Sequence, residues 1–120
     1  KEQPTLPQKY LGNLFEQFIG LELIRWSRLQ DTKPTLHFWR DSSGPEVDWL
    51  LNRNNTLLPI EVKWTSTPSS RDAKHLELFL KEYSTATQAY IVCQVSQPQI
   101  LSDNIEAISW KDLVSRLNDW

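Results

Sequence analysis

Charged residues stand inside two short apolar segments of this chain, and a gap of hairpin length separates the two segments. Residues 44–51 read Gly-Pro-Glu-Val-Asp-Trp-Leu-Leu, and residues 59–64 read Pro-Ile-Glu-Val-Lys-Trp. A strand of this kind must satisfy its charges, because burying a carboxylate without a partner is costly. The charges at Asp48, Glu61 and Lys63 therefore favour folds that bring these three side chains together.

Apolar residues that alternate, or that recur every three to four positions, divide the sequence into predicted strands and helices. Residues 1–8 contain Pro4 and Pro7 among polar residues, which is typical of a linker from a preceding domain. Residues 9–120 are predicted to form one domain. Its expected elements are helices at 9–29, 71–83 and 110–117 and strands at 36–40, 46–51, 57–64, 88–95 and 105–108.

The connections between these elements predict the fold class. Short turns join the first three strands, so these strands should form an antiparallel meander. The strand at 88–95 returns after a helix, which favours a parallel position beside the strand at 57–64. We therefore expect an α/β fold, a three-layer sandwich in which helices flank a mixed central sheet.

Strand parity predicts that the acids gather on one side of this sheet. Alternate residues of a strand point to opposite faces, so Glu46 and Asp48 should share one face and Val47 should lie on the other. Glu61 and Lys63 should likewise share a face. Two carboxylates beside an ammonium group provide oxygen ligands for a hard cation such as Mg²⁺ or Mn²⁺. The structural alternative is a partly buried cluster of salt bridges.

Composition limits the classes of function. The net charge of −2 and the pI of about 5.7 lack the strongly basic signature of a self-sufficient nucleic-acid-binding domain. Cys93 is the one cysteine, so a reducing, cytoplasmic setting is expected. No apolar segment approaches the length of a membrane span, and we expect no membrane partner. The absence of methionine suggests a domain taken from a longer polypeptide.

Four short motifs together resemble the PD-(D/E)xK nuclease superfamily. More narrowly, they are similar to a C-terminal domain of unknown function that follows the ATPase domain in many prokaryotic AAA+ type ATPases. The resemblance covers roughly residues 10–95. Its motifs are Gly12-x-x-x-Glu16, Phe38-Trp-Arg40, Glu46-Val-Asp48 and Ile60-Glu-Val-Lys63.

This resemblance implies a restriction-endonuclease-like fold with its site at the mouth of the central strands. It also implies that Asp48 and Glu61 bind Mg²⁺ (or Mn²⁺), that Glu16 completes the metal site, and that Lys63 assists the attacking water or stabilises the phosphate charge. The partners that it implies are DNA and an N-terminal ATPase domain of the same chain.

The acid on the first helix has two candidates. The resemblance favours Glu16, whereas Glu22 lies nearer the middle of the predicted apolar face. The two acids are about 120° apart around a helix and should not share one metal ion. Glu22 also has a structural alternative, an ion pair with Arg25 three residues later. The predicted apolar face contains Leu11, Leu14, Phe15, Phe18 and Leu21.

Two functions remain open from the sequence. The first is a Mg²⁺-dependent nuclease, or a degenerate derivative of one, that acts on DNA with an ATPase portion supplying most of the affinity. The second is a non-catalytic interaction module that docks on a protein partner or regulates the ATPase. The four motifs support the first function, and the acidic balance of charge supports the second.

Overall fold

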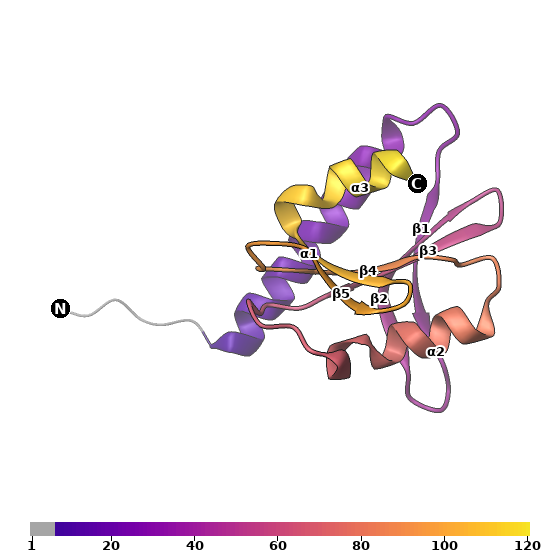
Figure 1. The fold of residues 1–120 in the computed structure, drawn as a ribbon. Coiled ribbons are helices and arrows are strands. Elements are labelled where there is room, and N and C mark those ends of the chain that lie inside the picture. Colours follow the sequence, from indigo (N-terminus) through magenta and orange to yellow (C-terminus); the bar gives the residue numbers. More distant parts are fainter. Residues whose placement is uncertain (1–6) are drawn as a thin grey trace.

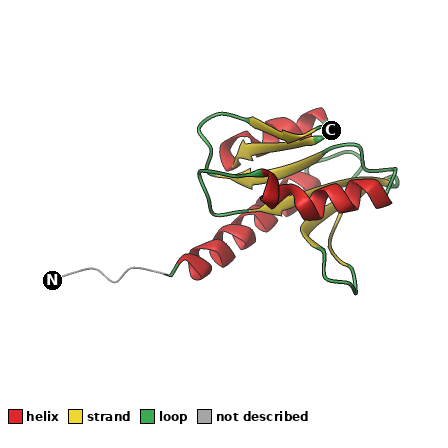
Figure 2. Ribbon diagram, turned by 60° about the horizontal axis from the view of Figure 1, so that its bottom comes forward, coloured by secondary structure: helices red, strands yellow, loops and turns green. Residues whose placement is uncertain are grey.

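The computed structural model of the protein describes residues 7–120, and Figures 1 and 2 show the arrangement of its helices and strands. One six-stranded sheet has helices against both faces, which confirms the predicted mixed α/β architecture. The helices are α1 (Gln8–Arg28), α2 (Lys74–Glu82) and α3 (Leu113–Asp119), with 3-10 turns at Ser70–Ala73 and Trp110–Asp112. The strands are β1 (Thr35–Arg40), β2 (Glu46–Arg53), β3 (Thr56–Val62), β4 (Ala89–Cys93), β5 (Gln99–Ser102) and β6 (Ile105–Ser109).

The strands lie in the order β1-β2-β3-β4-β6-β5. Strands β1, β2 and β3 are antiparallel, and β4 is parallel to both β3 and β6. The predicted meander and the predicted parallel return through a helix are therefore both confirmed. The arrangement places β3, which carries Glu61, in the interior of the sheet, with β2 and Asp48 beside it.

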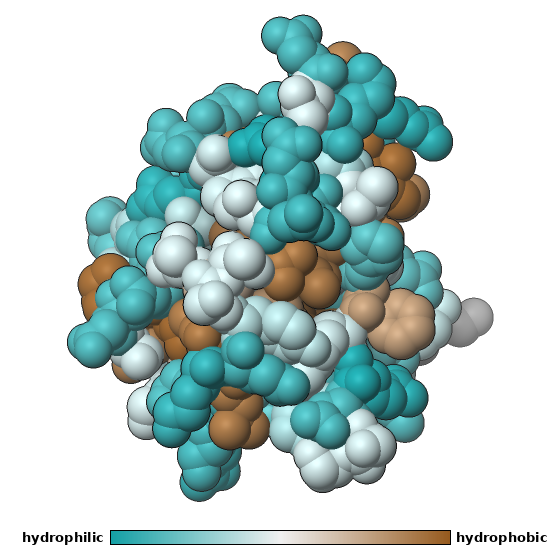
Figure 3. Space-filling view, turned by 90° about the vertical axis from the view of Figure 1, so that its right-hand side faces the viewer, coloured by the Kyte–Doolittle hydropathy of each residue, from teal (hydrophilic) through white to brown (hydrophobic). Residues whose placement is uncertain are grey.

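The sheet separates two apolar cores. Helices α1 and α3 cover one face, where Ile19, Ile60 and Leu117 belong to a single buried cluster. Helix α2 covers the other face, and its Phe79 packs in a second cluster with Ile91 of β4. Most side chains on the part of the surface seen in Figure 3 are hydrophilic, and the apolar side chains there form separate patches.

The turn between β2 and β3 fixes the register of the two acid-bearing strands. Asn54 and Asn55 both have positive φ angles, of 53° and 65°, as a two-residue hairpin turn with right-handed strand twist requires. Arg53 pairs with Thr56 across this turn, and the pairing continues to Trp49 and Ile60. The predicted hairpin is thus confirmed.

Strand β5 was not predicted from the sequence. It holds only two apolar residues, Ile100 and Leu101, and lies at the edge of the sheet, so it lacks the alternation that indicates a half-buried strand. The two-residue turn Asp103–Asn104 before β6 was the available signal for this hairpin. Elsewhere the predicted bounds differ by a few residues. The expected linker falls mainly at residues 1–6, which lie outside the described residues.

Helix α1 differs from its prediction in the face that it buries. Of the predicted apolar face, Phe15 is buried, but Leu14, Phe18 and Leu21 are exposed. The core face instead contains Phe15, Ile19, Leu23 and Trp26. The opposite face carries the α1 outer stripe, which we define as Tyr10, Leu14 and Leu21, whereas Phe18 packs edge-to-face against Trp110. Apolar residues on both faces explain why sequence periodicity selected the wrong one. Within residues 7–120, no helix is long and apolar enough to cross a membrane.

The simple alternation expected for β2 is wrong at its start. Val47 packs in the α2-side cluster together with Leu50, although their parity predicted opposite faces. The cause is an irregularity in the pairing with β1, where His37 faces Leu50 but Trp39 faces Val47. Strand β2 therefore has one more residue than β1 between these two pairs. This β-bulge changes the direction of the side chains around Asp48.

Candidate functional site

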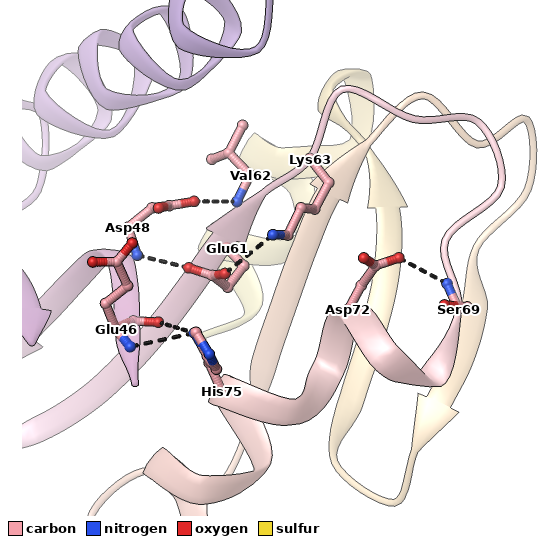
Figure 4. Close-up of polar contacts among 8 residues, drawn as sticks. All are labelled: Glu46, Asp48, Glu61, Val62, Lys63, Ser69, Asp72 and His75. Atoms are coloured by element: carbon pink, nitrogen blue, oxygen red, sulfur yellow. Dashed lines mark hydrogen bonds and ion pairs between the residues drawn. The ribbon is translucent and has the colours of Figure 1, made fainter. Parts of the chain in front are cut away.

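The pairing of β2 with β3 ends beside Asp48 and Glu61. The last paired residues are Trp49 and Ile60. Beyond them, the Asp48 backbone N–H donates to Glu61 Oε1 at 2.8 Å, and the Val62 N–H donates to Asp48 Oδ2 at 2.8 Å. Figure 4 shows the two carboxylates between the strands. Each acid therefore satisfies a backbone donor of the other strand, and the predicted proximity of the pair is seen.

Lys63 lies one residue beyond β3 and keeps the direction of that strand. Its backbone N–H donates to Val92 O at 3.0 Å, which ties it to β4. Its Nζ is 3.9 Å from Glu61 Oε2, and its side chain is about two-fifths exposed, whereas that of Glu61 is only 4% exposed. The Lys63 ammonium group therefore points toward Glu61 from the rim of the acid pair (Figure 4).

Helix α1 brings Glu16 to the same place. Gly20 lies so close to β2 that a Cβ added to it would be 2.5 Å from an atom of the Trp49 ring. The Trp49 Nε1–H donates to the Glu16 backbone carbonyl at 3.1 Å. This contact fixes the position of α1 against β2 and brings the Glu16 carboxyl group near that of Asp48, whose charge raises the pKa of Glu16.

The electrostatics of the acids follow from their burial and proximity. Burial, and then the charge of Asp48, raise the pKa of Glu61 from its ordinary value of 4.5 to about 8, although Lys63 lowers it in part. Burial raises the pKa of Glu16 to about 7, with further contributions from Asp48 and Glu46. Near neutral pH the cluster therefore retains protons that a cation would displace.

A cleft opens beside these acids, between α1 and the first two strands. Its volume is about 310 Å³. Glu46 forms an ion pair with Arg40 at 3.1 Å. The residues that line the cleft are Glu16, Phe38, Trp39, Arg40, Glu46, Val47, Asp48 and Trp49.

The structure separates the two candidates on α1. Glu22 lies away from Asp48 and pairs with Arg25 at 2.9 Å, as its structural alternative predicted. His75 is a neighbour of the site that sequence reasoning missed. Its Nδ1 is 3.0 Å from the Glu46 carbonyl oxygen. No pattern around His75 signals this contact, because it depends on how α2 packs against β2.

The donor chemistry fits Mg²⁺ or Mn²⁺, since Asp48, Glu61 and Glu16 all offer carboxylate oxygens. Within residues 7–120, however, no three His, Cys, Asp or Glu side chains lie close enough together to hold one metal ion. Mg²⁺ is commonly bound by one or two carboxylates, with water and substrate phosphate completing its coordination. The paired Asp48 and Glu61 match that requirement, with Glu16 beside them.

Comparisons with known proteins agree on a domain of this size. A structure titled "Refined half-complex from tetradecameric assembly of Thermococcus gammatolerans McrB AAA+ hexamers with bound McrC" contains a similar fold, with a TM-score of 0.60 at 17% identity. The match covers 91% of this chain but only 33% of that one, so this chain spans about a third of its structural neighbour. No curated protein matches the sequence. A family model described as a domain of unknown function (DUF4143) matches residues 11–113, and the chain therefore belongs to that family.

Proposed function

We propose that this domain is a nuclease-like module of a larger ATPase, which hydrolyses phosphodiester bonds of DNA with the help of Mg²⁺. The observation that carries the proposal is the placement of the Asp48 and Glu61 carboxylates on each other's strands, with Lys63 at the rim. Two carboxylates that replace ladder hydrogen bonds and raise the pKa of a neighbour are costly to keep, and such costs are typical of functional sites.

In this proposal each acid has a separate task. Asp48 and Glu61 would hold the cation, while Glu16 would complete the metal site through the attacking water, from which it would accept a hydrogen bond or a proton. A bound Mg²⁺ supplies Lewis-acid chemistry, because it polarises the phosphate and lowers the pKa of water. Lys63 stabilises the negative charge that develops on the phosphate, which is the task of a cation next to a reacting phosphoryl group.

The proposed link to an ATPase rests on charge and on the structural neighbour. A net charge of −2 gives the domain little attraction for a polyanion, so most of the DNA affinity must come from another part of the protein. The neighbour is a chain about three times as long in an assembly of AAA+ hexamers. A larger polypeptide of this kind would supply both the missing basic surface and the nucleotide site.

Cleavage assays on the full-length polypeptide, with Mg²⁺ and nucleotide present, test the catalytic proposal. Lys63→Ala should reduce kcat by orders of magnitude, because it removes the cation beside Glu61. Lys74→Ala is the matched control, since this exposed lysine lies on α2 and should only weaken DNA binding modestly. Metal-dependent cutting that survives Lys63→Ala, or no cutting by the wild type, would contradict the proposal.

The α1 outer stripe supports a second function, docking on the ATPase portion. Its three side chains, Tyr10, Leu14 and Leu21, are 51%, 44% and 59% exposed. The other face of α1 is buried against the sheet, so the helix is apolar on opposite sides. A helix with this pattern usually lies between two packed bodies. Figures 1 and 2 show the start of α1 extending beyond the sheet, where a second body would fit.

A double variant separates docking from chemistry. Leu14→Glu with Leu21→Glu places two charges in the stripe, far from the buried face of α1. In the full-length protein we expect this variant to change the assembly seen by sedimentation velocity and to let the domain unfold independently of the ATPase. Leu78→Glu is the control, because Leu78 is a comparably exposed residue (47%) that lies on α2, outside the stripe. Equal behaviour of the double variant and the wild type would argue against docking through α1.

A further inference from the structure

Phe38 is exposed in the middle of a strand, beside the acid cluster. Its exposure is 71%, although the residues around it are tied into the sheet by β1–β2 pairing. It belongs to neither apolar core. It does line the cleft that Glu16 and Asp48 also line. An aromatic ring that contributes nothing to the core is thus held at the mouth of the candidate site.

The direction of Phe38 follows from its neighbours on β1. Leu36 packs against the core on the α1 side, and Trp39 packs against the core on the α2 side. Because alternate residues of a strand share a face, Phe38 lies on the α1 side with Leu36. That is the side from which Glu16 approaches Asp48. The ring and the acids therefore border one space from different elements.

An exposed phenylalanine at this position favours association with other chains. Within residues 7–120, strand β1 is an edge strand, since it pairs there only with β2. Exposed apolar residues on edge strands promote pairing with other chains, and proteins commonly place charged residues there instead. The neighbouring strand position Arg40 shows that this edge tolerates charge. A ligand that uses the ring is a sufficient reason to keep Phe38.

We propose that Phe38 is a stacking platform for an unpaired base of single-stranded nucleic acid, with the adjoining phosphate directed toward the acid cluster. This inference rests on the proposed function and specifies its substrate class. A flat aromatic ring binds any unpaired base through its π-face, whereas the bases of a duplex are already stacked on one another. The cleft of about 310 Å³ has the size of a site for one small ligand.

The acids also determine when a strand can bind. Glu16, Glu46 and Asp48 line the same cleft, and their negative charges repel a phosphodiester unless a cation offsets them. Stacking on Phe38 supplies the opposing attraction. Neutralising Asp48 should therefore strengthen the binding of a single strand in the absence of metal, while removing the Phe38 ring should weaken it.

Fluorescence anisotropy with a labelled oligothymidylate, in EDTA at low salt, tests the inference without any cleavage. Base stacking on an aromatic side chain contributes about 1–3 kcal/mol, so Phe38→Ala and Phe38→Leu should each raise Kd by roughly 5-fold or more. Phe38→Trp should retain the affinity. Ile100→Ala is the matched control, because this residue is 72% exposed on the opposite edge strand. Asp48→Asn should lower Kd.

Several results would overturn the proposal. One is equal affinity of Phe38→Leu and wild type, and another is equal binding of a duplex of the same length. A third is no binding by either the wild type or Asp48→Asn. A dimer that depends on Phe38 and excludes oligonucleotide would assign the ring to pairing between edge strands instead. Since every measurement is made in EDTA, a failure of the proposed hydrolysis leaves these results unaffected.

Discussion

Asp48 and Glu61 each accept a backbone hydrogen bond from the opposite strand at the point where the pairing of β2 with β3 ends. The Glu61 carboxylate accepts the backbone N–H of Asp48, and the Asp48 carboxylate accepts the backbone N–H of Val62, each at 2.8 Å. Each acid thus completes the backbone hydrogen bonding of the opposite strand where the pairing ends. Structural support and the proposed chemistry depend on the same two carboxyl groups.

Stability should depend on pH through this pair. The unfolded carboxyl groups release their protons near pH 4.5, whereas folded Glu61 holds its proton to about pH 8 and Glu16 to about pH 7. Between these values the folded state binds more protons, so the free energy of unfolding falls as pH rises. In EDTA, we expect the Tm to decrease by several degrees between about pH 5 and pH 8. Differential scanning calorimetry across this range measures the effect.

The control for this prediction is Glu61→Gln, which keeps an acceptor for the Asp48 N–H and removes the titrating group. Its Tm should vary less with pH than that of the wild type. An identical pH dependence in both proteins would show that Glu61 is not the group responsible.

Metal affinity should depend on Asp48 and not on Glu22. Isothermal titration with Mn²⁺ should give binding to the wild type that releases protons at neutral pH, because Glu61 and Glu16 are partly protonated. Asp48→Asn should weaken this binding at least 10-fold, since it removes one charged ligand. Glu22→Gln should retain wild-type affinity because Glu22 pairs with Arg25 instead. Equal affinity of the wild type and Asp48→Asn would exclude a shared site.

Gly20→Ala should disturb the site from a distance. The new methyl group would overlap the Trp49 ring, so α1 or the ring must move. We expect a loss of about 1–3 kcal/mol in unfolding free energy, together with weaker Mn²⁺ binding through displaced Glu16. Gly12→Ala is the matched control, because a Cβ there meets no atom within 4 Å. That variant should be stabilised by about 0.5–1 kcal/mol. Denaturant unfolding of both variants measures the difference.

Cys93 should be chemically inert in the folded protein. It is fully buried in β4, and this burial raises the pKa of its thiol. A thiol-specific reagent should therefore react only at the rate of unfolding, and should react at once in denaturant. Fast labelling of the native protein would reveal an opening of the α2-covered face that the structure does not contain.

The meander was predictable because its signals are local. The Asn-rich turn and the short spacing between β2 and β3 determine their pairing without help from the rest of the chain. The gathering of Asp48 and Glu61 follows from that pairing. Strand β5 was missed because its pairing with β6 uses backbone hydrogen bonds at an edge, with little burial to leave a pattern in the sequence.

The orientation of α1 was not predictable from periodicity. The helix has two apolar faces, and only contact with the sheet decides which one is buried. The close approach of Gly20 to Trp49 is what turns Glu16 toward Asp48 and leaves Glu22 to Arg25. The bulge at the start of β2 is similar, since Val47 changes face through pairing with β1, and no residue type in the segment encodes it.

The two-residue turn at Asn54 and Asn55 has a consequence for how this site can change over evolution. The strands pair without interruption from the turn to Trp49 and Ile60. The number of residues between the turn and each acid therefore determines whether Asp48 and Glu61 lie opposite one another. Adding one residue to either strand alone would bring Ile60 or Val62 level with Asp48 in place of Glu61. A relative with a longer hairpin can retain the acid pair only if both strands grow by the same number of residues. Hairpin symmetry, more than the spacing of the acids along the chain, is therefore the feature by which divergent sequences with this site can be recognised.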